Sequence, residues 1–409
     1  MNKSKKERLF GDHFRQGLTE AEQALIEQVR ELCREHIGPN AAAVAQEDRF
    51  SWDTFHLLAR SGVLATAFPK KYGGSEARQV VRIRILEELG RTCSTAASMV
   101  TGADLSTRAI VAGASERLKE QLLPQLCTGK TQCAFALTEP GAGSDVRGIQ
   151  TKVHKEGSRY VISGSKKFIT RASTADWFVV IGRLTESDAK FVALIVPRDA
   201  PGLTISEDEP KLGWYGVPIA SLELRDVAIA NTHRLGEEGD GFNLAQDALL
   251  RARIGHAGMA LGRAMGALEI ASSYVVERQV SGKRLSEHQG VQWMLAEMVV
   301  QVEATRALLT LTAEKYDREA PDVALFASMV KLQATDLCMK VVTDALQLTG
   351  GRGFLKAFPL ERFFRDAKLN QIGEGSSEVH KTIIGRDIVR RAVAAERHPC
   401  LKPGPLVDY

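Results

Sequence analysis

Glu374 is the side chain whose setting in the sequence points most directly to chemistry. It stands between Gly373 and Gly375 in the segment QIGEGSSE, so its immediate neighbours supply no side chains to pack against it. A carboxylate left free in this way can point into a cavity and accept a proton as a general base. The structural alternative is a simple helix start with Ser377 as its N-cap, which leaves the carboxylate unexplained.

The segment FALTEPGAGSDV, residues 135–146, carries a second set of chemically useful groups. Gly141 and Gly143 enclose only an alanine, so the backbone can approach a ligand closely there. Exposed N–H groups and the Ser144 hydroxyl can hold phosphate oxygens. The pattern is not the dinucleotide fingerprint of a βαβ unit, because Val146 occupies the third glycine position. A tight turn in a β domain explains the segment equally well.

The segment SGSKKFIT, residues 163–170, predicts a turn followed by a strand. The two-residue period of a strand places Phe168 and Thr170 on one face. There they would offer a ring-shaped ligand an aromatic wall and a hydrogen bond. Taken alone, a core strand is the simpler interpretation.

Two further segments lie in the C-terminal third of the chain. The Glu277–Arg278 pair ends a long helical pattern, with Gly282 and Gln289 beyond it, and by itself is typical of a solvated helix surface. The loop QLTGGRGF, residues 347–354, contains three glycines, of which a helix C-cap accounts for one.

The spacing of apolar residues predicts the elements that carry these segments. Thr19 and Glu22 form a capping box before a helix, and helical periodicity continues to about residue 130. Short β-branched and aromatic runs follow to about residue 235, after which long Ala- and Leu-rich helical patterns return. We therefore predict an α-helical domain at 1–130, a β domain at 131–238 and a helical bundle at 239–409.

The composition disfavours several classes of function. The 409 residues include 54 Lys and Arg against 50 Asp and Glu, and the net charge of +4 is spread along the chain. We therefore expect no binding to nucleic acid or to a membrane through bulk charge. No signal peptide and no apolar run of ~18 residues are recognisable, so we expect a cytoplasmic protein. The six cysteines, Cys400 among them, include no CxxC pair, and the histidines lack metal-site spacing, so we expect neither a disulfide framework nor a metal site.

Five segments, in their order and spacing, together resemble the acyl-CoA dehydrogenase family. They are TEPGAGSDV, KKFIT, the Arg278 helix end, QLTGGRGF and RDAKLNQIGEGSSE, and the resemblance covers roughly residues 19–392. It implies an α+β fold with an N-terminal α-helical domain, a middle β-barrel or sandwich domain and a C-terminal four-helix bundle. It also implies FAD-dependent oxidation of an acyl thioester to its 2,3-enoyl form, with electrons passed to an electron-transfer flavoprotein.

Carried onto this chain, the resemblance implies two groups of FAD contacts. In the first, Thr138 lies near the flavin ring, Ser144 near the pyrophosphate, and Phe168 to Thr170 cover the other side of the ring. The second group reaches the FAD of a neighbouring subunit, which implies an obligate homo-oligomer, either a dimer or a tetramer. The implied FAD-binding residues are Phe135, Leu137, Thr138, Gly143, Ser144, Phe168, Ile169, Thr170, Arg278, His288, Gln289, Gln347, Gly351, Ser376 and Glu378.

Glu374 falls on the position of the family's catalytic base, which removes the α-proton of the thioester while the β-hydrogen leaves as hydride. Burial in an apolar site should raise the pKa of this carboxyl, and its own backbone N–H would help to bind the developing enolate oxygen. The implied substrate-binding residues are Ser144, Leu250, Arg253, Gly373 and Gly375.

Three positions depart from the family's pattern. Gly373 stands where Tyr is common, which leaves space for a short branched or cyclic acyl group unless Leu250 or Phe354 refills it. Ser281 replaces a common Phe beside the Arg278 helix end. Leu250 replaces an Asp that anchors the pantetheine arm, although Arg253 is kept, so coenzyme A and a phosphopantetheinyl carrier protein both stay open as carriers.

Two other functions are compatible with the same fold. Flavin-dependent monooxygenases and oxidases generally lack the base, so Glu374 favours dehydrogenation. A non-catalytic flavin-binding scaffold would need neither Glu374 nor Arg278. The sequence leaves the acyl group, the pathway and the electron acceptor undetermined.

Overall fold

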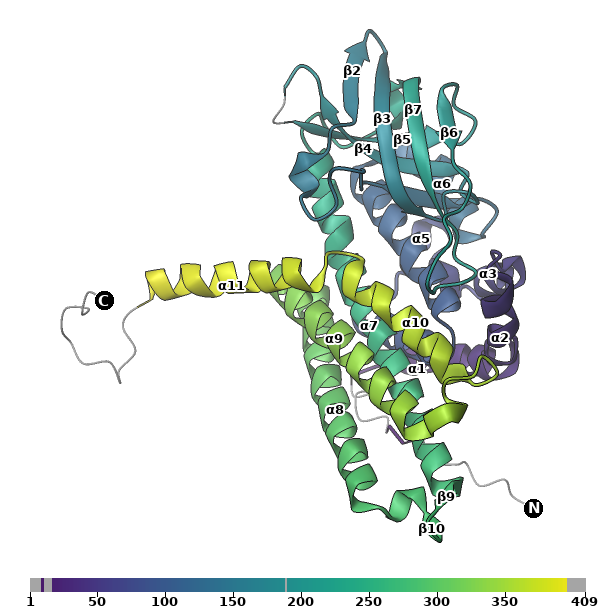
Figure 1. Cartoon of the computed structure of the whole chain (residues 1–409). Helices are drawn as coiled ribbons and strands as arrows, with labels where there is room; N and C mark the ends of the chain where they lie inside the picture. Colours follow the sequence, from purple (N-terminus) through teal and green to yellow (C-terminus); the bar gives the residue numbers. More distant parts are fainter. Residues whose placement is uncertain (1–8, 11–16, 188–189, 396–409) are drawn as a thin grey trace, which may run out of the picture.

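A computed structural model describes residues 9–10, 17–187 and 190–395 of the chain. The helical, β, helical order predicted from the sequence is confirmed (Figure 1). The N-terminal helices are α1 (Glu20–Leu32), α2 (Gly38–Glu47), α3 (Trp52–Arg60), α4 (Gln79–Thr92), α5 (Ser94–Gly113) and α6 (Glu116–Cys127). The C-terminal helices are α7 (Gly241–Glu277), α8 (Gln289–Asp317), α9 (Val323–Thr349), α10 (Pro359–Ile372) and α11 (Ser377–Ala394).

The predicted capping box at the start of α1 is present. The Glu22 N–H donates to Thr19 Oγ1 at 3.3 Å, and the Thr19 N–H donates to Glu22 Oε2 at 2.8 Å. Helical spacing then buries Ile26 and Val29 against the other N-terminal helices. The start of the first domain is thus set by local side-chain chemistry.

The β domain is one mixed sheet in the order β6-β7-β3-β2-β4-β5-β8, with β1 parallel to β4. Its strands are β1 (Cys133–Ala136), β2 (Lys152–Glu156), β3 (Arg159–Thr170), β4 (Trp177–Leu184), β5 (Phe191–Pro197), β6 (Leu203–Ile205), β7 (Ile219–Ala230) and β8 (Arg234–Leu235). Alternate residues face two different cores. Phe178 and Val180 of β4 face the core inside the β domain, whereas Val179 and Ile181 pack in the core shared with the N-terminal helices.

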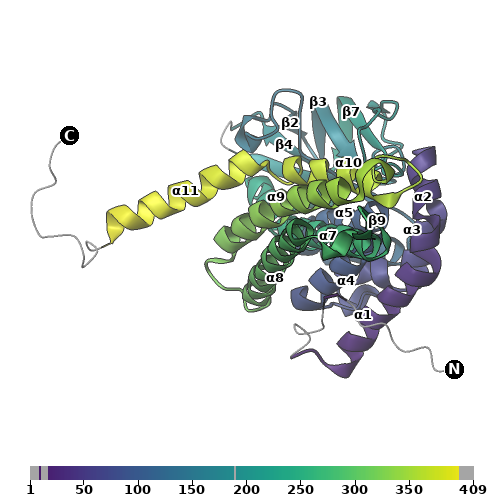
Figure 2. The same cartoon turned by 60° about the horizontal axis from the view of Figure 1, so that its bottom comes forward.

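Helix α7 is the axis of the C-terminal domain, and α4 packs directly against it (Figure 2). A Cβ at Gly262 would lie 2.1 Å from the Glu87 carbonyl oxygen of α4, and one at Gly266 would lie 2.4 Å from that of Arg91. Only glycine allows the two backbones to approach this closely. Two glycines at four-residue spacing therefore join the N-terminal domain to the bundle.

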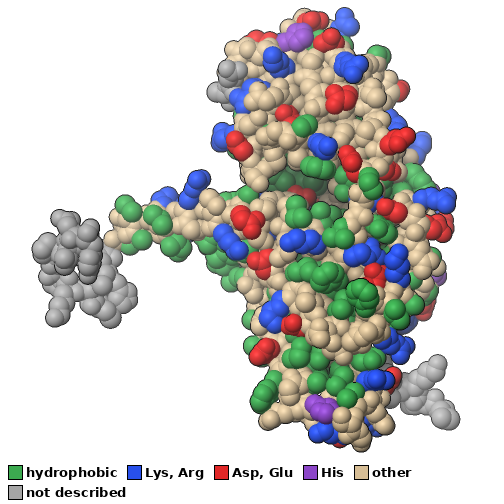
Figure 3. Space-filling view, in the orientation of Figure 1, with side chains coloured by type: hydrophobic (Ala, Val, Ile, Leu, Met, Phe, Trp, Pro, Cys, Tyr) green, Lys and Arg blue, Asp and Glu red, His purple; other side chains and the backbone are tan. Residues whose placement is uncertain are grey.

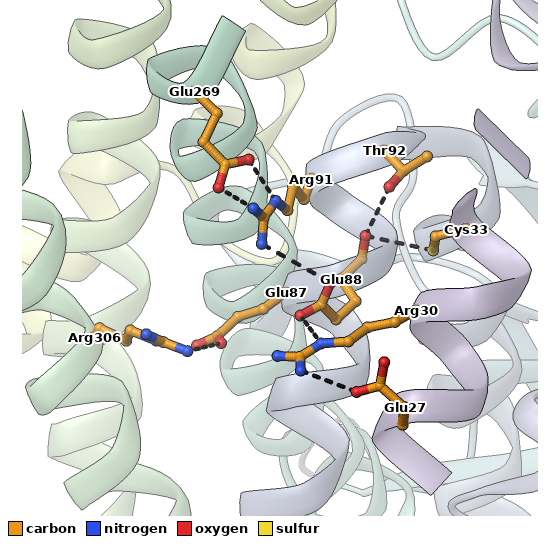
Figure 4. A network of polar contacts seen from close by, with 9 residues as sticks. All are labelled: Glu27, Arg30, Cys33, Glu87, Glu88, Arg91, Thr92, Glu269 and Arg306. Carbon is orange, nitrogen blue, oxygen red and sulfur yellow. Dashed lines mark hydrogen bonds and ion pairs between the residues drawn. The ribbon is translucent and has the colours of Figure 1, made fainter. Parts of the chain in front are cut away.

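Charged side chains on α4 pair with helices on both sides of it (Figure 4). Glu88 Oε1 pairs with Arg30 Nε of α1 at 2.8 Å, and Glu87 Oε2 pairs with Arg306 Nη2 of α8 at 3.3 Å. Arg91 pairs with Glu269 of α7. A single helix thus holds three others through ion pairs inside the protein.

The described cysteines are buried free thiols, and Cys400 lies outside the described residues. Among the described residues, no helix has the length and apolar character needed to cross a membrane. Within residues 9–10, 17–187 and 190–395, no group of His, Cys, Asp and Glu side chains is arranged to hold a metal ion.

We expect Glu87→Ala to lower the free energy of unfolding by about 3–5 kcal/mol, because it leaves the buried cations of Arg84 and Arg306 without this partner. Asp344→Ala, which breaks the more exposed i,i+4 pair with Lys340, is the control and should cost about 0.5 kcal/mol or less. Denaturant midpoints measure both, and equal losses would contradict the structural role of the α4 ion pairs.

Candidate active site

Glu374 lies in the short turn between α10 and α11, with its side chain largely buried. Its backbone has φ +57°, in the left-handed region that non-glycine residues rarely occupy. Such strained backbone persists only where the surroundings fix it, and it is concentrated at functional sites. The helix start offered as an alternative is real but one residue earlier: Ser376, not Ser377, caps α11 by accepting from the Val379 N–H, while the Ser377 hydroxyl donates to Asp336.

Three basic side chains from three helices hold the backbone of this turn. Arg253 of α7 donates through Nε to the Glu374 carbonyl oxygen at 3.4 Å, and His380 of α11 lies 3.3 Å from the same oxygen. Lys331 of α9 donates to the Gly375 carbonyl oxygen at 2.6 Å. Because the three contact main-chain oxygens, the carboxylate of Glu374 stays available.

Burial raises the pKa of the Glu374 carboxyl, while the charges of Arg253 and Lys331 oppose that rise. Burial also lowers the pKa of Lys331 to about 8. A carboxyl whose pKa is raised is a stronger base than an exposed glutamate, yet these two cations keep its ionised form accessible. The arrangement suits removal of a weakly acidic proton.

The backbone at Gly373 could carry a side chain without a clash. Its φ is −66°, and an added Cβ would meet only the Leu369 carbonyl oxygen at 3.6 Å and His256 Cε1 at 3.8 Å. Neither Leu250 nor Phe354, the residues named above as possible occupants, lies within 4 Å of that added Cβ. Leu250 packs instead against the core of the bundle, and Phe354 is 81% exposed.

The two segments expected to bind flavin lie side by side in the β domain. The Lys167 N–H donates to the Thr138 carbonyl oxygen at 2.8 Å. Buried Glu139 fixes the loop by accepting from the N–H groups of Gln150 and Thr151, and it pairs with Lys166 Nζ at 2.7 Å. The loop's conformation is therefore secured from inside, and its outer face is left for a ligand.

That outer face has the features of a site for a ring and a phosphate. Phe168 is 61% exposed and has φ +58° at a break in the pairing of β3 with β7, whereas Ile169 is buried. The hydroxyls of Thr138, Ser144 and Thr170 make no hydrogen bond within the described residues. A Cβ at Gly141 or Gly143 would meet nothing within 4 Å. Unpaired hydroxyls and an exposed aromatic ring fit FAD.

Two other residues expected to contact FAD are less exposed. Phe135 is half-buried and Leu137 packs in the core.

The second group of expected FAD contacts lies at the far end of α7. Arg278 caps that helix at the end of the molecule opposite the β domain (Figure 1), about 25 residues or roughly 37 Å along the helix from Arg253. The β-domain segments lie at the other end of the molecule from this group (Figure 1). The members of this group are exposed Arg278, Gln289, Gln347 and Gly351, and half-buried His288, whose Nε2 is enclosed without a partner among the described residues. Exposed Ser281 lies beside them, whereas Ser376 and Glu378 begin α11.

Comparisons with known proteins decide the family. Models of the N-terminal, middle and C-terminal domains of acyl-CoA dehydrogenases match residues 19–130, 134–227 and 239–389. The chain belongs to the acyl-CoA dehydrogenase family. Acyl-CoA dehydrogenases are oxidoreductases that act on a CH–CH bond, and FAD is their cofactor.

The relatives extend over nearly the whole chain. Cyclohexane-1-carbonyl-CoA dehydrogenase of Geobacter metallireducens is 35% identical over 90% of this chain and 97% of its own. Butyryl-CoA dehydrogenase of Megasphaera elsdenii has a TM-score of 0.87 at 32% identity, covering 91% and 99% of the two chains. A glutaryl-CoA dehydrogenase of Mycobacterium smegmatis, solved with FADH2, has a TM-score of 0.86 at 27% identity, covering 91% and 95%.

Four side chains at or near Glu374 were not anticipated from the sequence: His256, Lys331, His380 and, behind His256, Asn370. His256 stands three residues after Arg253 on α7, a spacing that puts both on one helix face. That spacing is a signal that could have indicated His256. Lys331 lies inside the long, mainly apolar pattern of α9, where nothing local distinguishes it. Asn370 lies in the segment RDAKLNQIGEGSSE, but the segment does not show which side chain it contacts.

Replacing Arg278 by Ala should weaken FAD retention roughly tenfold or more, as expected for loss of a hydrogen bond to a charged group. Its side chain is exposed, so the melting temperature of the apoprotein should not change. Arg318→Ala removes another exposed arginine, at the C-terminus of α8, and serves as the control. The ratio of FAD to protein after gel filtration measures the effect, and equal loss in both variants would argue against a role for Arg278.

Proposed function

We propose that this acyl-CoA dehydrogenase oxidises a short, branched or cyclic acyl thioester to its 2,3-enoyl form, with Glu374 as the base. The observation that carries the proposal is a buried carboxyl of raised pKa beside Gly373, which carries no side chain and where an added Cβ would make only ordinary contacts. Glu374 provides the basic group, and the neighbouring space admits the substituted carbon chain.

In this reaction Glu374 removes the proton from the α-carbon of the thioester. The Glu374 N–H makes no hydrogen bond within the described residues, so it can donate to the developing enolate oxygen. Bound FAD supplies the acceptor for the hydride that leaves the β-carbon. Arg253 and Lys331 keep the base ionised before the transfer, since both charges favour the carboxylate.

The substrate class is supported by two independent features. The absence of a side chain at Gly373 leaves room beside the reacting carbons for a branch or ring of the substrate. The Geobacter relative is named for a cyclic acyl-CoA. Coenzyme A is the proposed carrier, with a carrier-protein thioester as the alternative, and an electron-transfer flavoprotein is the proposed electron acceptor.

The proposed enzyme works as a homo-oligomer, either a dimer or a tetramer. Arg278 and its neighbours cannot serve the FAD held by the β domain of the same subunit, so a second copy must bring its own β domain to them. Helix α11 extends away from the body and carries hydrophobic side chains along its surface (Figure 3), with Ile388, Val389 and Val393 all exposed. An apolar helix of this kind is suited to packing against another subunit.

Glu374→Gln should keep FAD bound but slow flavin reduction by at least ~10²-fold, because an amide cannot take up the α-proton. The wild-type rate should rise with pH as the carboxyl, whose pKa is raised, loses its proton. Glu297→Gln, on an exposed position of α8, is the matched control. Anaerobic stopped-flow reduction by acyl-CoA thioesters measures both variants, and a wild-type rate in Glu374→Gln would refute the assignment of the base.

We expect the wild-type enzyme to prefer 2-methyl-branched or cyclic acyl-CoA over straight-chain acyl-CoA by about ten-fold or more in kcat/KM. Gly373→Tyr should abolish activity on the branched substrate and spare a short linear one, because a Cβ at this position meets only ordinary contacts. Steady-state rates on butyryl-CoA and cyclohexane-1-carbonyl-CoA provide the comparison. Equal loss on both would show that the space at Gly373 does not select the substrate.

A further inference from the structure

A row of buried polar side chains crosses the helical core and ends at the Glu374 carboxylate. Ser94 Oγ of α5 accepts from Arg263 Nη2 of α7 at 2.6 Å, and Arg263 Nη1 donates to Asn370 Oδ1 of α10. Asn370 Nδ2 lies 3.4 Å from Nδ1 of His256, and His256 Nε2 lies 3.7 Å from Glu374 Oε1. Buried polar groups in an apolar core are tolerated only when each has a hydrogen-bond partner. The donor and the acceptor at each contact of this row are therefore defined.

The direction of the row assigns the tautomer of His256. A guanidinium has no acceptor, so the oxygen of the Asn370 amide must face Arg263 and its NH₂ must face His256. Nδ1 of the ring then accepts, and the neutral imidazole carries its proton on Nε2, the atom nearest Glu374. Burial lowers the pKa of His256 to about 3, with the charges of Lys331 and Arg263 adding to the effect, so the ring is neutral at physiological pH.

The plane of the ring is fixed as well. His256 stacks on Trp214 with ring centroids 5.8 Å apart and an interplanar angle of 26°. The Trp214 backbone N–H donates to Asp366 Oδ1 at 2.6 Å, and its indole N–H donates to the Asp366 carbonyl oxygen at 3.0 Å. Helix α10 therefore holds the ring from both sides, through Asp366 by way of Trp214 and through Asn370 one turn later.

The charged and titratable groups around Glu374 differ in what they contact. Arg253 of α7, Lys331 of α9 and His380 of α11 reach main-chain oxygens of residues 374 and 375. His256 is the group whose donor lies nearest the carboxylate among the described residues, and its Cε1 borders the space beside Gly373. His256 therefore lies next to both the base and the proposed substrate position.

We propose that His256 is a positioning residue: its Nε2–H donates to the Glu374 carboxylate and orients that carboxylate toward the space beside Gly373. The inference rests on the proposed role of Glu374 as the base. The 3.7 Å separation is longer than a hydrogen bond, and such contacts commonly shorten when substrate fills the site. A donor to the carboxylate favours its ionised form, so removing the donor should raise the pKa of Glu374.

Two substitutions separate the donor from the ring. His256→Phe keeps a ring to stack on Trp214 but has no N–H, whereas His256→Gln keeps a donor in place of the ring. The test follows the rate of anaerobic flavin reduction by the preferred acyl-CoA in the holoenzyme as a function of pH. The midpoint of the fall in rate at low pH, here called the acid limb, should lie about one pH unit higher in His256→Phe than in the wild type. In His256→Gln it should stay near the wild-type position. The reduction rate should fall more than the affinity for substrate. His154→Phe, at a partly exposed position of β2, is the control and should leave the pH dependence unchanged.

A second measurement does not depend on turnover. Histidine-selective ¹⁵N NMR of the substrate-free wild-type holoenzyme should show His256 as a neutral ring protonated on Nε2 at neutral pH, identified by loss of its signals in His256→Gln. A ring protonated on Nδ1, or a cationic ring, would overturn the inference even if His256→Phe does not fold.

The outcomes distinguish this inference from the proposed function. A wild-type rate in Glu374→Gln would overturn both. A normal loss in Glu374→Gln, together with an unmoved acid limb in His256→Phe, would overturn the role of His256 alone. A change confined to substrate affinity would show that His256 contacts substrate and does not position the base.

Discussion

The direct backbone contact between α4 and α7 is the constraint on which the rest of the structure depends. Gly262 and Gly266 let α4 approach, and the ion pairs of Glu87 and Arg91 fix its rotation against the bundle. With α7 held in this way, Arg253 and His256 face α10 and the turn that follows it, while Arg278 reaches the far end of the molecule. Displacement of this one helix would disturb the base, its surroundings and the expected second FAD contact together.

In the turn at Glu374, the side chains that hold the backbone do not pair with the carboxylate. Three basic side chains bind the carbonyl oxygens of residues 374 and 375, so a strained backbone is held without direct pairing of the carboxylate. A direct ion pair would lower the carboxyl pKa strongly and weaken it as a base. Holding the backbone instead leaves the carboxyl buried and its pKa raised, with cations close enough to limit that rise.

In the β domain, buried side chains likewise hold a loop and leave its outer groups unpaired. Glu139 and Lys166 form a buried pair beneath the segment 138–144, and the main-chain bond between Lys167 and Thr138 joins the loop to β3. A buried pair of this kind contributes little net stability but fixes one arrangement. The hydroxyls and the Phe168 ring on the outer face are therefore presented by a loop that Glu139 and Lys166 hold from inside.

The sequence by itself determined the order of the domains, the capping of α1, the position of Glu374 and the family, because caps, turn residues and apolar periods are local signals. The tertiary structure decided which side chains surround that carboxylate. His256, Lys331 and Asn370 come from three helices and meet only when those helices pack. It also showed that Leu250 packs against the bundle core and Phe354 faces solvent, so neither contacts the Cβ position of Gly373. A periodic pattern states which face of a helix is buried, but only packing determines which residues of another helix that face will meet.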